Sequence, residues 1–221
     1  MPNAYIAGEG FFVPPKIVTN HDLSKYINTS DEWIRERTGI QERRFVEKGI
    51  GPSDLAIPAT EQALESAGLS VGDIDFMIFA TSTPDYYIPG SGCLLQEKMD
   101  FNEIGALDIR VQCAGFVYGL SIAEQYIKTG MYKNILLVGA EVQSTAMEIS
   151  DEGRDTAIIF GDGSGAAIIC ATEEERGILS THMHSEGKHL KELWVEAPAS
   201  RAGHPRILPE HLVKGKQYLK M

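Results

Sequence analysis

The chain has 221 residues, of which 43% are hydrophobic, and its formal net charge is −11 at pH 7. That length and apolar fraction are sufficient for one large globular core. An acidic field does not attract polyanions, which argues against a general nucleic-acid-binding or anionic-membrane surface. No run of about 18 apolar residues occurs, and the N-terminus lacks the basic region of a signal peptide. We therefore expect a soluble, cytoplasmic protein in which any anionic ligand meets a local cluster of basic side chains.

The first third of the chain predicts one strand and three helices. The stretch AYIAGEGFFVPP predicts a buried strand that ends at its prolines. In TNHDLSKYI a short helix is expected after Thr19 or Asn20 as the cap, and in TSDEWIRERTGI a second helix after Ser30, ended by Gly39. The stretch PSDLAIPATEQALESAG predicts a longer helix with one apolar face, ended by Gly68.

Alternating strands and helices follow in the middle of the chain. Strands are expected in IDFMIFATST, ALDIRV and NILLVGAEV, with helices over residues 91–99 and 114–128 between them. Continuous apolar strands separated by helices are typical of a parallel sheet covered on both faces. The sequence therefore predicts an α/β fold.

The last third is less regular. We expect a β-hairpin with strands over residues 156–160 and 166–171 and a turn at 161–165, then one strand in GILSTHMHS. The glycine-rich turn lacks the Lys-Ser/Thr of a phosphate-binding loop. The remaining residues have weak periodicity and do not predict a finished domain.

Cys113 stands where an apolar strand gives way to an amphipathic helix. The unpaired N–H groups at a helix N-terminus favour negative charge, and Ala114 and Gly115 leave room for a substrate carbonyl. The alternative is an ordinary core cysteine, which is the common fate of a free thiol and the one expected for Cys93 and Cys170. We expect the helix to be anchored by apolar residues at helical spacing: Phe116, Val117, Leu120, Ala123 and Ile127.

Four motifs resemble one enzyme family in their order and spacing. They are TSDEWIRERTGI, VQCAGFVYGLSIAEQYIKTG, GRDTAIIFGDGSGAAII and GILSTHMHSEG. Over residues 3–190 the chain resembles β-ketoacyl-acyl-carrier-protein synthase III, a condensing enzyme of the thiolase fold. The resemblance implies a thiolase-like layered fold with helices around a mixed, mainly parallel sheet. Residues 1–172 would form the N-terminal half that carries the nucleophile, and residues 173–221 the beginning of the C-terminal half.

The resemblance also implies the chemistry. Cys113 would take an acyl group from acyl-CoA as a thioester, and the acyl-enzyme would condense with malonyl-acyl-carrier protein as carbon dioxide leaves, in fatty acid biosynthesis. No cofactor is implied, since acyl-CoA is a substrate. We expect Trp33 and Arg154 to hold the CoA adenine between them, Thr29 to contact its edge and Arg37 to meet phosphate.

For each arginine near Trp33 the alternative is a solvated surface position. That alternative is expected most strongly for Arg43 and Arg44. In the family a loop that corresponds to TSTPDYYIPGSG reaches across a homodimer interface, and its residue before the proline, here Ile88, would limit the partner's acyl tunnel. The alternative for Ile88 is an interface residue without influence on chain length.

Three histidines could suggest a metal site. His182 and His184 would lie on one strand face with His189 nearby, an arrangement that could hold a metal. The resemblance implies that this stretch is a structural strand, and we therefore expect no metal.

Two elements that the family uses for condensation are missing. None of the six histidines lies in a His-Gln-Ala-Asn motif, and no counterpart of the family's catalytic asparagine is found. We therefore expect a truncated chain that is inactive alone. One alternative is a related condensing or acyl-transfer enzyme for long-chain acyl-CoA. The other is a noncatalytic half-protein that binds acyl-CoA or dimerises.

Overall fold

The computed structural model describes residues 1–202 and 205–221, so that His204 lies outside the described residues. The chain forms two compact units, each built from three stretches of sequence. The first, which we call the sheet unit, comprises Met1–Pro14, Glu47–Glu141 and Gly163–Met183. The second, the hairpin unit, comprises Pro15–Val46, Val142–Asp162 and His184–Met221.

A five-stranded sheet forms the centre of the sheet unit, with the strand order β1-β7-β6-β4-β5. Strand β4 pairs in parallel with both β5 and β6, and β1 pairs antiparallel with β7. All five residues of β4 are buried, as expected for a strand covered on both faces. The strands are β1 (Asn3–Phe12), β4 (Phe76–Ala80), β5 (Gly105–Ile109), β6 (Asn134–Val142) and β7 (Asp162–Thr172).

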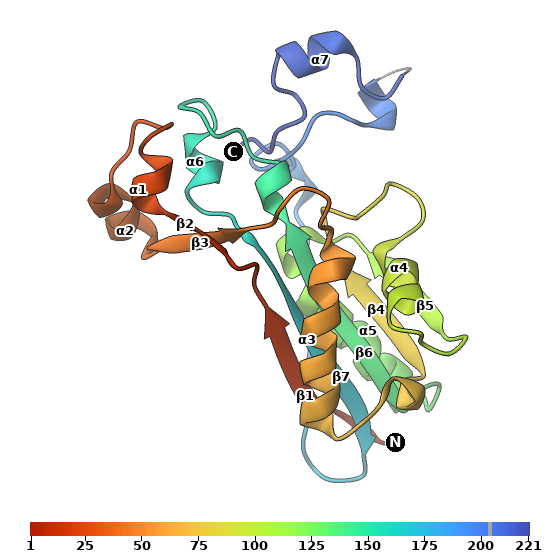
Figure 1. The fold of residues 1–221 in the computed structure, drawn as a ribbon. Coiled ribbons are helices and arrows are strands. Elements are labelled where there is room, and N and C mark those ends of the chain that lie inside the picture. The colour runs from red at the N-terminus through yellow and green to blue at the C-terminus, as the bar shows by residue number, and fades with distance from the viewer. Residues whose placement is uncertain (203–204) are drawn as a thin grey trace. The chain divides into compact units, whose positions relative to one another are not determined.

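Helices cover both faces of this sheet (Figure 1). Helix α3 (Pro52–Ala67) packs with α4 (Ser91–Lys98) on one face, and α5 (Gly115–Lys128) lies on the other. The approach of α3 to β1 is close, because a Cβ atom built on Gly10 would lie 2.2 Å from the Ala59 carbonyl oxygen. Only a residue without a side chain fits there. The predicted mixed, mainly parallel α/β architecture is confirmed.

The hairpin unit has a smaller core of its own. Its two-stranded sheet joins β2 (Lys16–Thr19) to β3 (Glu42–Phe45), a pairing that the sequence did not predict. The helices are α1 (Asn20–Leu23), α2 (Asp31–Thr38), α6 (Arg154–Ala157) and α7 (Pro209–Val213). The predicted caps are confirmed, because Thr19 accepts a hydrogen bond from the Asp22 N–H and Ser30 one from the Trp33 N–H. The core residues are Val18, Leu23, Ile27, Ile34, Phe45, Met147, Ala157 and Ile158.

Arg43 is part of this core, which corrects the expectation of a solvated position. Its side chain is 5% exposed and donates hydrogen bonds to the Val18 carbonyl (3.2 Å), the Asn20 Oδ1 (2.7 Å) and the Ile158 carbonyl (3.1 Å). Burial lowers the pKa of the guanidinium from its ordinary value. Arg43 therefore joins the hairpin to the segment that follows α6.

Two predictions for the last third were wrong. Residues 156–160 do not form a hairpin strand, because α6 covers residues 154–157 and β7 alone continues through the glycine-rich stretch, with Ser164 opposite Phe12 of β1. The stretch GILSTHMHS is not a strand either. Within it the Ile178 N–H donates to the Ala4 carbonyl (2.8 Å), but Leu179 is 89% exposed. A strand needs a continuous ladder of backbone hydrogen bonds, and no such ladder forms among the described residues.

Candidate active-site turn and basic aromatic cluster

Cys113 lies in the turn between β5 and α5. A single 3-10 turn, Gln112–Ala114, follows β5 after two residues and leads directly into α5 at Gly115. The thiol is exposed. The predicted junction of strand and helix is therefore present, and Cys113 is available to a reactant from solvent.

The backbone at this turn has two special features. Gln112, directly before the cysteine, has φ +47°, a left-handed conformation that a residue with a side chain rarely adopts. A Cβ atom added to Gly115 would lie 2.9 Å from the Cβ of Ala80 at the end of β4. A strained residue and a close helix–strand approach thus hold Cys113 at the start of the helix, and strain of this kind often occurs at functional sites.

Helix α5 is anchored through four of the five apolar residues expected. Ala123 and Ile127 are fully buried, and Phe116 and Leu120 pack partly against the same core. Val117 is 51% exposed, so its predicted anchoring role was wrong.

The other two cysteines differ from each other. Cys170 is buried in β7 as predicted, and burial, together with the negative charge of Asp75, raises the pKa of its thiol to about 11. Cys93 is exposed on α4, so its predicted core position was wrong. The buried face of α4 contains Ser91, Gly92 and Leu95, and Cys93 does not lie on that face.

A basic aromatic cluster in the hairpin unit brings together three of the residues expected to bind CoA. The guanidinium carbon of Arg37 lies 4.2 Å from the Trp33 ring centroid, and that of Arg154 lies 5.0 Å from it. Trp33 and Arg37 are on α2, whereas Arg154 begins α6. Both cation–ring distances are within the range of favourable cation–π contacts.

The distances also limit what the cluster can hold. A planar ligand between two planar groups needs about 7 Å between them, because carbon atoms in contact lie about 3.5 Å apart. The 5.0 Å between Arg154 and Trp33 leaves no such gap, so the Arg154 side chain has to move for a ring to enter. Arg37, expected at a phosphate, stacks on Trp33 in this structure.

Two arginines near the cluster form ion pairs with carboxylates. Arg35 pairs with Asp31 (3.5 Å) and Arg44 with Glu42 (3.0 Å). Thr29 is half-buried, and its hydroxyl oxygen has no hydrogen-bond partner among the described residues. Arg43 is buried, and Arg35 and Arg44 are ion-paired. Arg37 is therefore the arginine of this group that is exposed and makes no ion pair with a described residue.

Ile88 lies in the segment between β4 and α4 and is 80% exposed, next to exposed Tyr86 and Tyr87. An exposed side chain of this size is available for contact with another molecule.

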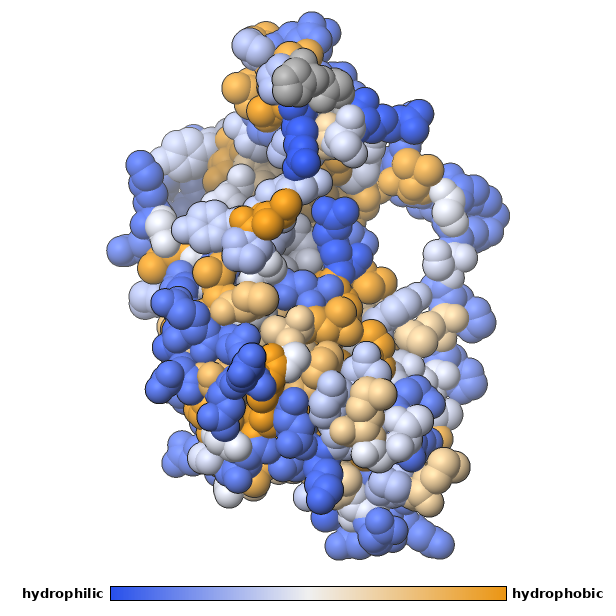
Figure 2. Space-filling view, turned by 90° about the vertical axis from the view of Figure 1, so that its right-hand side faces the viewer, coloured by the Kyte–Doolittle hydropathy of each residue, from blue (hydrophilic) through white to orange (hydrophobic). Residues whose placement is uncertain are grey.

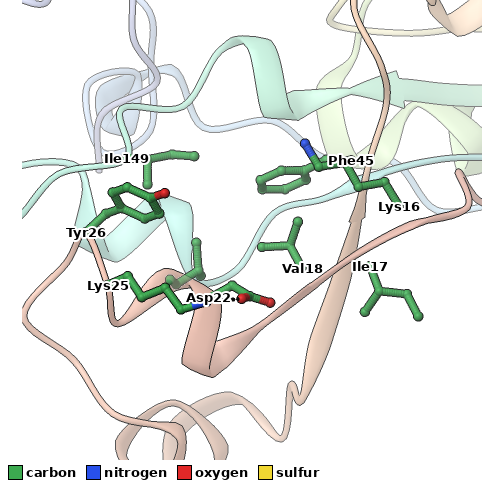
Figure 3. Close-up of a pocket in the computed structure, with 9 residues that line it drawn as sticks. Lys16, Ile17, Val18, Asp22, Lys25, Tyr26, Phe45 and Ile149 are labelled. Carbon is green, nitrogen blue, oxygen red and sulfur yellow. Dashed lines mark hydrogen bonds and ion pairs between the residues drawn. The ribbon is translucent and has the colours of Figure 1, made fainter.

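A cavity of about 530 Å³ opens in the hairpin unit (Figure 3). Tyr26, Phe45 and Ile149 point toward the same space, whereas Ile17 points away from it. Lys25 at its rim pairs with Asp22 (2.7 Å). None of Cys113, Trp33 or Arg154 lines this cavity; the lining residues are Lys16, Ile17, Val18, Asp22, Leu23, Lys25, Tyr26, Phe45 and Ile149.

The histidines of the THMH stretch do not form a metal centre. His182 contacts the Ser180 hydroxyl (3.2 Å), and His189 pairs with Glu186 and Glu192. Over residues 1–202 and 205–221, no group of three or more His, Cys, Asp or Glu side chains is placed to hold a metal ion. In the same ranges no helix is both long and apolar enough to cross a membrane.

Comparisons with known proteins agree with the fold described above. The mixed, mainly parallel sheet with its covering helices has the thiolase-like fold of solved 3-oxoacyl-acyl-carrier-protein synthase III structures. Residues 107–187, which include Cys113, match the family model described as 3-oxoacyl-[acyl-carrier-protein] synthase III. The chain belongs to the β-ketoacyl-acyl-carrier-protein synthase III family.

Individual relatives are similar over most of this chain. A β-ketoacyl-acyl-carrier-protein synthase III of Bacillus cereus is 46% identical over 194 residues, which cover 88% of this chain and 62% of the relative. The crystal structure of the Aquifex aeolicus synthase III matches with a TM-score of 0.82 and 40% identity over 86% of this chain and 61% of that one. The Pseudomonas aeruginosa structure matches with a TM-score of 0.85 and 31% identity, over 99% and 64%. The chain thus spans somewhat over half the length of these relatives.

Proposed function

We propose that this chain carries the nucleophilic half of a β-ketoacyl-acyl-carrier-protein synthase III-like condensing enzyme, with Cys113 as the residue that is acylated. The observation that supports this most directly is the exposed thiol at the start of α5, between left-handed Gln112 and tightly packed Gly115. Residues 1–172 are the N-terminal half and residues 173–221 the beginning of the second half in this proposal.

The first half-reaction is a thioester exchange. The Cys113 sulfur attacks the carbonyl carbon of an acyl-CoA, the bond from that carbon to the CoA sulfur breaks, and the thiol proton ends on CoA. The carbonyl oxygen becomes negative in the tetrahedral intermediate. Backbone N–H groups at the start of a helix are suited to stabilise it.

The second half-reaction uses malonyl-acyl-carrier protein. Loss of carbon dioxide leaves an enolate, whose carbon attacks the acyl group on Cys113 and releases the thiolate, giving a 3-ketoacyl product. The family's histidine and asparagine for this step have no matching motif in the 221 residues. We therefore assign acylation, but not enolate stabilisation, to residues of this chain.

The basic aromatic cluster is our proposed CoA site. Trp33 and Arg154 would stack on the adenine after Arg154 moves away from the ring, and Arg37 would turn toward a phosphate. Thr29, whose hydroxyl lacks a partner among the described residues, would meet the adenine edge. The net charge of −11 makes such a local cationic site necessary for an anionic substrate.

We also propose a cytoplasmic homodimer. Among the described strands β5 pairs with β4 alone, so its other edge can pair with a strand from a second copy. The side of the molecule that carries α4 and β5 presents hydrophobic as well as hydrophilic residues to solvent (Figure 2). Ile88, on the exposed segment before α4, would then limit the acyl site of the partner subunit.

Intact-mass spectrometry tests the acylation step. The chain is incubated with acetyl-CoA or octanoyl-CoA, and we expect one acyl group on the wild type and on a Cys93→Ala control, because Cys93 is also an exposed thiol. The Cys113→Ala variant should gain none.

Each outcome has a separate meaning. An adduct that persists in Cys113→Ala would overturn the assignment of the nucleophile. No adduct on the wild type with either thioester, while CoA still binds, would instead identify a noncatalytic acyl-CoA-binding protein. A strong preference for octanoyl-CoA would favour a long-chain condensing or acyl-transfer enzyme on the same scaffold.

A further inference from the structure

The segment from Thr81 to Gly90, between β4 and α4, contains no helix or strand and yet exposes a row of large apolar side chains. Tyr86, Tyr87 and Ile88 are 61%, 60% and 80% exposed. An irregular segment with such side chains can present them reproducibly only if its backbone is held by other contacts.

Glu141 supplies the first of these contacts. It lies on β6, two residues beyond Gly139, which pairs with Ala80 of β4, so the parallel register places it beside Ser82. One carboxylate oxygen accepts the Ser82 N–H (2.8 Å), and the other accepts the hydroxyls of Ser82 (2.8 Å) and Thr83 (2.7 Å). Charge-assisted hydrogen bonds of this kind are stronger than neutral ones.

Two further carboxylates hold the rest of the segment. Asp85 accepts hydrogen bonds from the Ser53 N–H (3.2 Å) and hydroxyl (2.7 Å), and its own N–H donates to the Ser91 hydroxyl (3.2 Å). Asp108 accepts the Ser91 (2.6 Å) and Gly92 (3.0 Å) N–H groups at the start of α4. The exposed residues 86–88 therefore lie between anchored ends.

The anchored segment begins at the edge of the sheet from which the Cys113 turn also leaves. The Thr81 N–H donates to the Ile109 carbonyl at the end of β5 (3.2 Å), and Ala80 is the residue against which Gly115 packs. The first residue of the segment, Thr81, therefore lies close in the fold to the turn that carries Cys113.

We propose that Glu141 is a positioning residue that sets the acyl-chain preference of the enzyme by fixing the segment Thr81–Gly90 and, through it, Ile88. The proposal rests on the function proposed above, in which Ile88 limits the acyl site of the partner subunit. When Glu141 is removed, Ser82 and Thr83 lose their shared acceptor, the segment moves more freely, and Ile88 no longer blocks longer chains.

The experiment compares Glu141→Ala and Glu141→Gln with a matched control, Asp73→Asn. Asp73 accepts the N–H (2.8 Å) and hydroxyl (2.6 Å) of Ser70, the same chemistry at a site that does not contact the segment. Two quantities are measured: hydrogen exchange of residues 81–90, and the rates of Cys113 acylation by acetyl-, hexanoyl- and decanoyl-CoA.

We expect Glu141→Ala to speed hydrogen exchange in the segment and to raise the decanoyl-to-acetyl rate ratio about tenfold, the lower end of the discrimination that one methylene gives in an apolar pocket. Glu141→Gln, which keeps the size of the side chain, should shift the ratio in the same direction but less. Asp73→Asn should change neither quantity. In an Ile88→Ala background, Glu141→Ala should have no further effect on the ratio, because the two residues act through one contact.

Three results would overturn the proposal. They are an unchanged rate ratio in Glu141→Ala, an equal decrease of all three rates, which would indicate general destabilisation, and additive effects with Ile88→Ala. The absence of acylation in the wild type with every thioester would refute the proposed function itself. The exchange measurement would then still show whether Glu141 holds the segment.

Discussion

The Cys113 turn and the basic aromatic cluster are held in place by different kinds of contact. At the turn the backbone decides the geometry, through the left-handed Gln112 and the approach of Gly115 to Ala80. In the cluster, side chains decide the geometry, because Trp33 and Arg154 come from separate helices and meet through a cation–π contact of 5.0 Å.

This difference has consequences for how each region responds to substitution. A change at the turn alters the packing of α5 on a buried core, so it affects folding as well as chemistry. A change in the cluster removes a half-exposed contact and leaves the fold nearly intact. The turn is preorganised, whereas the cluster has to rearrange when a ligand enters.

The largest expected effect concerns the rates at which the three thiols react with iodoacetamide. At about pH 8 iodoacetamide should modify Cys113 and Cys93, with Cys170 slower by roughly 100-fold or more, since only a thiolate reacts. The pKa of about 11 keeps the Cys170 thiol protonated, so its labelling should rise as the pH approaches that value. Peptide mass mapping measures all three, and rapid labelling of Cys170 at neutral pH in the folded protein would contradict the buried environment.

The second prediction tests whether the turn depends on backbone packing. Gly115→Val should lower the free energy of unfolding by about 2–3 kcal/mol, because the new side chain overpacks against Ala80. Gly165→Val is the control: a Cβ there meets nothing within 4 Å, and valine suits a strand. Urea denaturation gives both values. Equal stability of the two variants would mean that the close approach at Gly115 is not needed.

The third prediction addresses the cluster. Arg154→Ala or Trp33→Ala should weaken CoA binding about tenfold, the loss expected for a desolvated cation–π or stacking contact. Arg44→Ala should leave the affinity unchanged, since Arg44 pairs with Glu42 on β3. Isothermal titration calorimetry distinguishes them. Equal losses in Arg154→Ala and Arg44→Ala would remove the site assignment.

The smallest expected effect comes from α2, the helix that carries Trp33 and Arg37 of the cluster. Ser30→Ala removes the cap that accepts the Trp33 N–H (3.1 Å) and should lower the free energy of unfolding by about 1 kcal/mol. Ser24→Ala, which removes a surface hydrogen bond to the His21 carbonyl (2.9 Å), serves as the control. Thermal unfolding measures the difference. A larger effect from Ser24→Ala would show that α2 does not depend on its cap.

Much of the sheet unit was predictable because its signals are local. The apolar face of α3, the glycine after it and the buried strand β4 are readable from neighbouring residues. The pairing of β2 with β3 was not, since these four-residue strands carry charged residues without a clear alternation. At GILSTHMHS the sequence predicted a strand that the structure does not contain. Its composition is typical of a strand, but no neighbouring strand pairs with it along its length among the described residues.

The candidate site divides in the same way. The position of Cys113 before a helix followed from the sequence, as did the presence of Trp33 and the arginines. Burial of Arg43 did not follow, because it depends on three acceptors contributed by Val18, Asn20 and Ile158. Exposure of Cys93 depended on which face of α4 meets the sheet, and the exposure of Val117 was equally not readable from its helical spacing.

The sequence by itself determined the helices with clear caps, the buried strands and the cysteine at the strand–helix junction, because caps and periodicity act between residues close in the chain. Only the tertiary structure decided that Trp33 meets Arg154 and that Glu141 holds Ser82 and Thr83. These contacts join residues far apart in sequence, and they depend on strand register and helix packing, which arise only when the whole core is assembled.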